Sequence, residues 1–188
     1  MNSLPTGCAI SEEDFSKCKE LANSTLELFR GRRGHYSNSL NSHLRGKIGE
    51  FGGTLVLERL GFRVRPLWSK LECLSEADID IDGRLRLDVK TWDRRYWPSM
   101  GRCIAVNQLP RLRRKASAIL WCVSDSQLEP GMTVQVVGWN TLDDVAEAPR
   151  RLTGPPNGRQ VDNYQVDEAC LRNLESLRTY CAGLQGTE

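Results

Sequence analysis

The sequence predicts an α/β protein in which helices flank a central mixed β-sheet. Two observations carry this prediction. Apolar residues recur with helical spacing towards both ends of the chain, and alternating or continuous apolar runs bounded by turn residues lie between them. The expected order is a helix, three strands, a helix and two strands, with further helices at both ends. With 188 residues, the chain has the length of one domain.

The first helix is expected to begin at Glu12, because Ser11 can cap it and acidic residues follow in its first turn. Segment 30–42 is basic and rich in Gly, Asn and Ser, which is typical of a loop. A second helix over about 42–60 ends before Gly61, a residue type favoured just past a helix end. The two apolar faces consist of Phe15, Cys18, Leu21, Ala22, Leu26 and Phe29, and of Leu44, Ile48, Phe51 and Leu55.

The remaining elements follow from apolar runs and turn signals. Asn107 is the expected cap of a helix that runs to about Lys115, with Pro110 in a first turn that tolerates proline. Cys103 and Cys122 lie in apolar runs and are expected to be buried free thiols. The other expectations are strands at 62–67, 103–106, 117–123 and 133–139, a hairpin within 77–92, a short helix over 141–148, a loop over 149–159 and a final helix over 167–179.

The chain divides into an N-terminal helix with a basic loop (1–41), a core (42–139) and a C-terminal extension (140–188). It has no signal peptide and no apolar stretch approaching the about 18 residues that span a membrane, so we expect a cytoplasmic protein without a membrane partner. Its seven cysteines form no CxxC pair, which argues against structural zinc and a secreted disulfide scaffold. It has neither a Walker loop nor a GxGxxG motif after a strand.

The charge is unevenly distributed. Residues 30–115 carry 19 Lys and Arg against 9 Asp and Glu, whereas the rest of the chain carries 7 against 15. The basic residues cluster with aromatic residues in RGRRGHY (30–36) and DRRYW (93–97), a combination that suits phosphate contact and stacking. This pattern indicates a polyanion partner facing the middle of the chain.

The segment ADIDIDGRLRLDVKTW (77–92) reads as a hairpin that turns at Asp82-Gly83. A two-residue turn mixes charged and apolar side chains on both faces. A three-residue connection over 82–84 places Ile79, Ile81, Leu85, Leu87 and Val89 on one face, and burial of that face selects this register. Asp78, Asp80, Arg86, Asp88 and Lys90 then share the other face.

In this register Asp78 and Asp88 are cross-strand neighbours, and adjacent like charges are destabilising. A divalent cation bound between the two carboxylates would offset the repulsion, with Lys90 ready to hold an incoming anion. Replacing Asp88 by Asn is therefore expected to leave the melting temperature of the metal-free protein equal or higher.

The helix that precedes the hairpin carries GKIGEFGG (46–53). Four glycines within eight residues weaken a helix, so its backbone is expected to approach a sheet or a ligand closely. Glu50 lies in the middle of this stretch.

With Glu50 on a helix, then Asp78, then Asp88-Val89-Lys90, residues 42–123 resemble the PD-(D/E)XK nuclease superfamily, the fold of many restriction enzymes, resolvases and phage exonucleases. The resemblance implies a restriction-endonuclease-like three-layer core with a central mixed sheet flanked by helices, plus the N-terminal and C-terminal helices. The proline that precedes the first aspartate in the superfamily is replaced by Ala77, and Asp80 on the same face could compete with Asp78.

The resemblance also implies roles for individual residues. Asp78 and Asp88 would hold Mg²⁺ or Mn²⁺ together with the Val89 carbonyl, Glu50 would hold a water or a second ion, and Lys90 would orient the attacking water and stabilise developing charge. Gln108 is a candidate accessory residue, as is Asp80. The candidate nucleic-acid contacts are Arg32, Arg33, Lys47, Arg94, Arg95 and Tyr96.

The expected activity is hydrolysis of DNA phosphodiester bonds by an endonuclease. A structure-selective resolvase, a nickase and an inactive nuclease fold that binds nucleic acid remain open alternatives. Exonuclease action, homodimer formation, the DNA substrate and an origin in a phage, a mobile element or a host repair system stay open as well.

Overall fold

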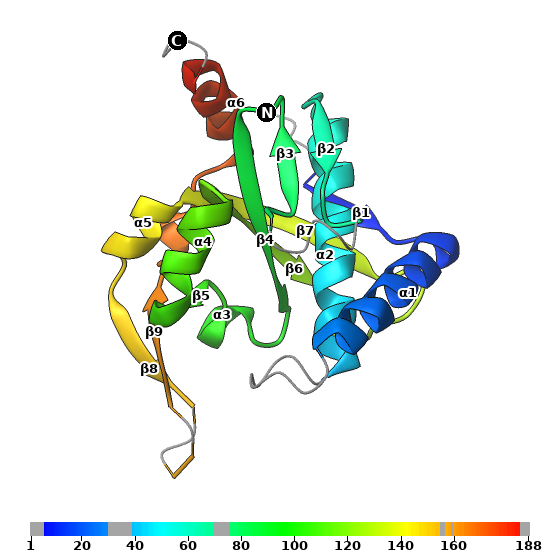
Figure 1. Cartoon of the computed structure of the whole chain (residues 1–188), viewed down its shortest axis with the longest axis horizontal. Helices are drawn as coiled ribbons and strands as arrows, with labels where there is room; N and C mark the ends of the chain where they lie inside the picture. The colour runs from blue at the N-terminus through cyan, green and yellow to red at the C-terminus, as the bar shows by residue number, and fades with distance from the viewer. Residues whose placement is uncertain (1–5, 30–38, 70–75, 155–156, 159, 185–188) are drawn as a thin grey trace.

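A six-stranded mixed sheet forms the centre of the protein in a computed structural model, which describes residues 6–29, 39–69, 76–154, 157–158 and 160–184 (Figure 1). The strand order is β1-β7-β6-β4-β3-β2. The central strands β4 and β6 run parallel, and each other neighbouring pair in this sheet is antiparallel. The strands are β1 (Gly7–Ala9), β2 (Val64–Pro66), β3 (Ile79–Ile81), β4 (Leu85–Asp93), β6 (Ala118–Ser124) and β7 (Thr133–Thr141).

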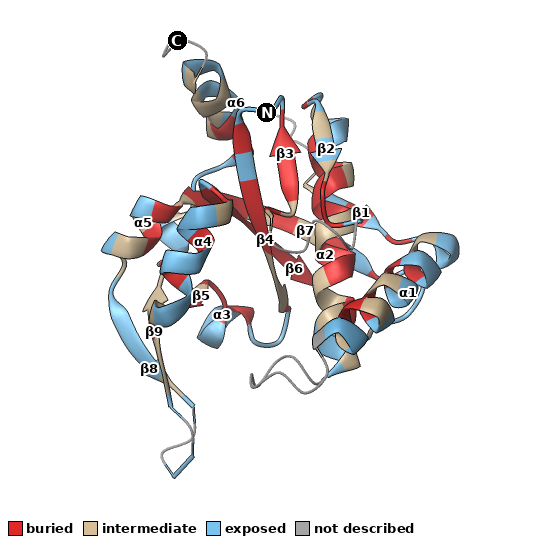
Figure 2. Cartoon of the chain, in the orientation of Figure 1, coloured by how far each residue is buried: buried red, intermediate tan, exposed pale blue. Residues whose placement is uncertain are grey.

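Helices cover both faces of this sheet. The helices α1 (Glu12–Phe29) and α2 (Leu40–Arg59) lie on one face, and α4 (Leu109–Lys115) and α5 (Leu142–Glu147) lie on the other (Figure 1). Strand β6 is buried along its whole length because its side chains alternate between the two cores (Figure 2). Leu120 packs in the core below α2, whereas Trp121 packs in the core below α4.

The remaining elements lie at the periphery. A second sheet of order β5-β9-β8 lies on the α4 side and consists of β5 (Cys103–Ala105), β8 (Arg150–Thr153) and β9 (Val161–Gln165). The hairpin of β8 and β9 extends away from the main body (Figure 1). The last helix, α6 (Leu174–Gly183), packs Leu174 and Leu177 into the α2-side core. Within the described ranges no helix is long and apolar enough to cross a membrane.

The predicted hairpin register is confirmed. Ile79 pairs with Leu87 and Ile81 pairs with Leu85. The turn places Asp82 and Gly83 at φ of 54° and 72°, a left-handed conformation that Asp and Gly adopt more readily than other residues. The face predicted to be apolar is buried in the core below α2, which leaves the charged residues on the α4 side of the sheet.

The prediction that the glycine-rich helix approaches the sheet is also confirmed. A Cβ atom on Gly49 would lie 1.6 Å from Oγ1 of Thr91 on β4, and one on Gly52 would lie 2.8 Å from Val134 on β7. By contrast, a Cβ on Gly46 would meet nothing within 4 Å. Glycines at 49 and 52 therefore let α2 carry Glu50 close to the central strands.

Several boundaries differ from the predicted ones. Residues 106–108 form a 3₁₀ turn, so α4 begins at Leu109 with Gln108 as its N-cap, and the predicted cap at Asn107 is wrong. The predicted loop over 149–159 contains β8, and the predicted helix over 167–179 begins only at Leu174. Cys122 is buried as predicted, but Cys103 is only half-buried. The strands β1 and β9 and the short helix α3 (Trp97–Met100) were not predicted.

Candidate active site

Two aspartates meet at the start of the β3–β4 hairpin. Asp78 directly precedes β3, and its backbone N–H donates to the carbonyl oxygen of Leu87 at 2.9 Å. Its Oδ2 accepts a hydrogen bond of 2.7 Å from the backbone N–H of Val89. Asp88 is 0% exposed in the middle of β4. The observed register thus makes Asp78 and Asp88 cross-strand neighbours, as the sequence predicts.

Two lysines neutralise Asp88. Oδ2 pairs with the ammonium of Lys90, and Oδ1 pairs with the ammonium of Lys115. Apart from these ammonium groups, neither Asp88 oxygen has a hydrogen-bond partner within the described part of the chain. Burial disfavours the carboxylate, but the two lysines outweigh burial and lower the pKa of Asp88 below its ordinary value.

The sequence predicts that a divalent cation offsets the repulsion between Asp78 and Asp88. In the structure, Lys90 and Lys115 supply compensating charge to Asp88, so the repulsion between the two aspartates does not by itself require a cation. Replacement of Asp88 by Asn would leave both ammonium groups without their carboxylate partner. The expectation that this substitution leaves stability unchanged or higher therefore no longer holds.

Asp78 has the opposite electrostatic environment. Burial, the charge of Asp88 and the charge of Glu50 raise the pKa of Asp78 to about 7, although Lys115 and Lys90 act against the shift. A carboxyl group with this pKa takes up or releases a proton near neutrality. The pKa values of the two adjacent aspartates are therefore shifted in opposite directions.

Glu50 reaches the same group of charges from α2. Its Oε2 lies 2.7 Å from Nζ of Lys47, and that ammonium also donates to the carbonyl oxygen of Trp68 at 3.1 Å. Lys47 is only 5% exposed, so its ammonium is not placed to contact a phosphate at the surface. The structure thus makes Lys47 a partner of Glu50, which differs from its expected role in nucleic-acid contact.

Asp80 lies on the same face but serves the hairpin itself. Its Oδ1 accepts from the backbone N–H of Gly83 at 2.7 Å, and its Oδ2 accepts from Arg65 at 2.8 Å. Asp80 is 2% exposed, and both of its oxygens are engaged in these contacts. This arrangement favours Asp78 over Asp80 as the partner of Asp88.

The candidate accessory residue Gln108 lies away from the carboxylates. It is exposed at the start of α4, whereas Lys115 at the other end of that helix reaches Asp88. A helix of this length spans about 10 Å. Lys115 was not predicted as a site residue, although its position in the helix indicates that it lies on the buried face. Lys115 continues the helical spacing of Leu109 and Leu112, both of which are buried.

The arginines that follow β4 are exposed and partly paired. Arg95 is 64% exposed, lies 3.1 Å from Asp93 and stacks over Tyr96 at 5.3 Å from the ring centroid. Arg94 is 51% exposed and lies 3.5 Å from Asp125. Both remain accessible to a phosphate backbone. Arg32 and Arg33, which belong to the same predicted surface, lie outside the described residues.

Asp93 fixes the end of β4. It accepts hydrogen bonds from Arg95 and from the hydroxyl of Ser126, and Arg45 on α2 approaches it to 3.2 Å. Burial acts in the opposite direction, but Arg95, Ser126 and Arg45 together lower the pKa of Asp93 to about 2. Arg45 also donates to Ser124 and to the carbonyl oxygen of Asp125, so this cluster ties α2 to β4 and β6.

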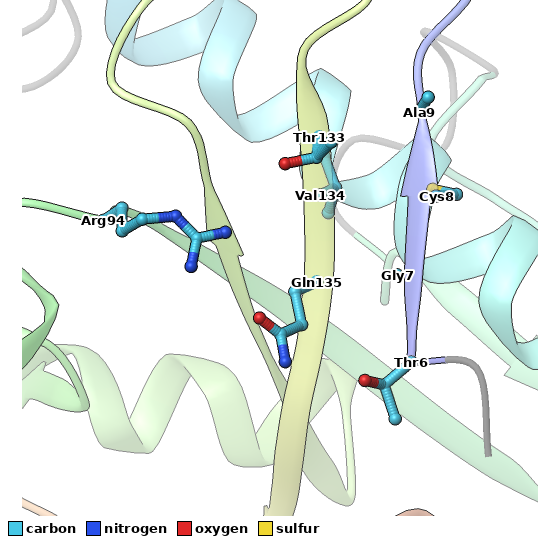
Figure 3. Close-up of a pocket in the computed structure, with 8 residues that line it drawn as sticks. All are labelled: Thr6, Gly7, Cys8, Ala9, Arg94, Thr133, Val134 and Gln135. Atoms are coloured by element: carbon cyan, nitrogen blue, oxygen red, sulfur yellow. The ribbon is translucent and has the colours of Figure 1, made fainter. Parts of the chain in front are cut away.

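A pocket of about 420 Å³ lies beside Arg94 and is lined on its other side by the edge strand β1 and the neighbouring strand β7 (Figure 3). Its lining includes the polar side chains of Thr6, Thr133 and Gln135. Among the described residues, Arg94 is the one candidate site residue that lines it, and neither Asp78 nor Asp88 does. The pocket is therefore separate from the carboxylate cluster.

Asp78 and Asp88 fit a hard divalent cation in their chemistry. Both are oxygen ligands, and the buried oxygens of Asp88 face only ammonium groups. Within the described ranges no group of three or more His, Cys, Asp or Glu side chains is arranged to hold one metal ion. An ion at this site would thus depend on the two aspartates and the Val89 carbonyl, with solvent filling the remaining positions, as Mg²⁺ commonly requires.

Comparisons with protein-family models, with curated proteins and with solved structures found no match to this chain.

Proposed function

We propose that the chain is a nuclease of the PD-(D/E)XK type that hydrolyses DNA phosphodiester bonds with Mg²⁺ or Mn²⁺. The observation that carries the proposal is the pairing of Asp78 with Asp88 beside Lys90 on the central hairpin. Two adjacent carboxylates with a lysine beside them combine a cation site with a group that can hold an anion.

The order of the elements supports a restriction-endonuclease-like fold for the core. Helix α2 is followed by the antiparallel strands β2, β3 and β4, then by α4 and by β6, which runs parallel to β4. This is the order that the resemblance implies, and it brings Glu50 of α2 into the electrostatic field of Asp78.

Each site residue has a task in the proposed reaction. The cation, once bound, would polarise the phosphodiester and stabilise the charge that develops on its oxygens. Asp78 and Asp88 would hold the cation, and Glu50 keeps Lys47 within the site. The Lys90 side chain is 30% exposed, and its ammonium can orient the attacking water and stabilise negative charge. Arg94 and Arg95 bind flanking phosphates.

The test is incubation of the protein with supercoiled, linear and single-stranded DNA, with Mg²⁺ and with chelator. Wild-type protein should cleave DNA only with the cation. The variant Asp88→Asn should lose at least about a hundredfold in rate, as expected for loss of a group that stabilises the transition state. Asp143→Asn is the matched control, because Asp143 is 84% exposed in its side chain and pairs with Arg113. Full activity in chelator would disprove the proposal.

A second candidate is a nuclease fold that binds DNA without cleaving it. The observation that favours it is the complete neutralisation of Asp88 by two lysines, which gives the site a stable state without metal. DNA binding without cleavage of any of the three substrates would establish this alternative. Conversion of supercoiled DNA to open circles alone would indicate a nickase. If none of the three substrates is cleaved, a branched DNA is added as a fourth, and cleavage confined to it would indicate a resolvase.

A further inference from the structure

Lys115 is a second lysine that reaches the centre of the site. It is the last residue of α4, its side chain is 16% exposed, and its ammonium pairs with Oδ1 of Asp88. Lys90 pairs with the other oxygen of the same carboxylate. Asp88 therefore carries one ammonium group on each of its oxygens.

Lys115 is held by charge rather than by a network of neutral partners. Within the described part of the chain, Asp88 is its only ion-pair partner. Lys47, by contrast, is fixed by both Glu50 and the Trp68 carbonyl. Lys115 can therefore leave Asp88 if another anion replaces it.

The sum of the charges in the site indicates that a bound divalent cation requires an additional anion for neutrality. Three lysines, Lys47, Lys90 and Lys115, balance three carboxylates, Glu50, Asp78 and Asp88, when all are ionised. A divalent cation adds two positive charges. The transition state for hydrolysis of a phosphodiester by hydroxide carries two negative charges, which restores neutrality only if all three lysines remain charged.

We propose that Lys115 is a second phosphate-binding lysine of this active site. It pairs with Asp88 in the metal-free protein, and its ammonium would move from Asp88 to a non-bridging phosphate oxygen of DNA when a divalent cation occupies the carboxylate. This assignment rests on the proposed nuclease function. Lys90 and Lys115 face different oxygens of Asp88, so both ammonium groups would be available to a phosphate that approaches this carboxylate.

The test compares wild type with Lys115→Met, Lys115→Arg and the control Lys19→Met, which removes an exposed lysine of α1. Calorimetry measures the affinity of the DNA-free protein for Mg²⁺, and single-turnover assays with saturating DNA measure cleavage. The folded state of each variant is checked by thermal melting.

Lys115→Met should bind Mg²⁺ about tenfold more tightly, because a positive charge that competes for Asp88 is gone. The same variant should cleave DNA about a hundredfold more slowly, because a cation that stabilises the transition state is lost. Lys115→Arg should recover most of the cleavage rate, since it restores the charge. Tighter binding of the metal together with slower cleavage is a combination that a merely structural lysine does not produce.

The proposal is overturned if Lys115→Met cleaves as fast as Lys19→Met while the wild type is active. It is also overturned if Lys115→Met loses Mg²⁺ affinity and cleavage together and Lys115→Arg restores neither, because Lys115 would then only support the fold. Absence of Mg²⁺-dependent cleavage in the wild type overturns the nuclease function itself, and the role of Lys115 with it.

Discussion

Asp78 and Asp88 show how far two identical side chains can differ when they are neighbours on one hairpin. Asp88 has an ammonium on each oxygen and a lowered pKa, whereas burial and the charges of Asp88 and Glu50 raise the pKa of Asp78 to about 7. Ionisation of Asp88 thus stabilises the metal-free fold, and ionisation of Asp78 opposes it.

Substitutions at the two positions should therefore have opposite effects on stability in chelator. Asp88→Asn should lower the free energy of unfolding by about 1–3 kcal/mol, because two partly buried ammonium groups lose their buried carboxylate partner. Asp78→Asn should raise it by about 1 kcal/mol or more, because it removes an unfavourable buried charge. Thermal or urea denaturation of both variants, with Asp143→Asn as the exposed control, measures the two changes.

Mg²⁺ extends the same experiment. A ligand that binds only the folded state raises the melting temperature of the wild type, and it should raise that of Asp88→Asn and of Asp78→Asn much less. Equal stabilisation of all three proteins by Mg²⁺ would place the cation elsewhere.

Asp93 allows a separate test by pH. Its pKa of about 2 lies below the ordinary value of 3.8, so its charge stabilises the folded protein above about pH 4, and this contribution disappears as the pH falls towards 2. Asp93→Asn should lower the free energy of unfolding by about 1–3 kcal/mol at neutral pH, because charged hydrogen bonds to Arg95 and Arg45 are lost. The difference from wild type should shrink as the pH falls, and a difference that is constant with pH would contradict this origin.

At the scale of elements, the β3–β4 hairpin was predictable because two local signals agreed. Asp82-Gly83 marked the turn, and the apolar alternation on both sides selected one register. The short strands β1, β8 and β9 had no such local signal. Each is defined by a partner strand elsewhere in the chain, as when Gly7–Ala9 pairs with β7.

Helix α2 offers a matched pair of substitutions. Gly46→Ala should raise the free energy of unfolding by about 0.5–1 kcal/mol, because the new methyl group meets no neighbour and alanine favours the helix. Gly49→Ala should lower it by about 1–3 kcal/mol, because the methyl group would clash with Thr91 and push α2 away from β4. Denaturation curves of the two variants, recorded under identical conditions, give the comparison. Similar changes at both positions would mean that the helix does not pack this closely.

At the scale of the whole molecule, the sequence predicted the order of the central elements and the pairing of Asp78 with Asp88. It did not predict the charge balance of the site. Lys115 stands in a basic run that resembles a solvated helix face, and its pairing with Asp88 depends on how α4 packs against β4. Lys47 was predicted to contact nucleic acid at the surface. It is instead buried, and its ammonium contacts Glu50 and the carbonyl oxygen of Trp68.

The exposed arginines after β4 should contribute to DNA binding through released counterions. We expect the double variant Arg94→Gln/Arg95→Gln to bind DNA more weakly and to reduce the slope of log K against log salt by about 2, close to one per lost phosphate contact. Neutral replacements are preferable to charge reversal, because a carboxylate at position 95 would face Asp93. The control Lys17→Gln/Lys19→Gln removes two positive charges from α1. An equal decrease of the salt slope in both double variants would mean that Arg94 and Arg95 do not contact DNA phosphates specifically.

We propose that Asp78 and Asp88 together hold the divalent cation of a nuclease. Anomalous diffraction from crystals grown with Mn²⁺ tests it most directly, because it locates the ion without relying on activity. We predict an anomalous peak in contact with carboxylate oxygens of both Asp78 and Asp88, and loss of that peak in Asp88→Asn. A Mn²⁺ peak that lies only at other acidic residues, or no peak at Mn²⁺ concentrations that support DNA cleavage, would contradict the claim.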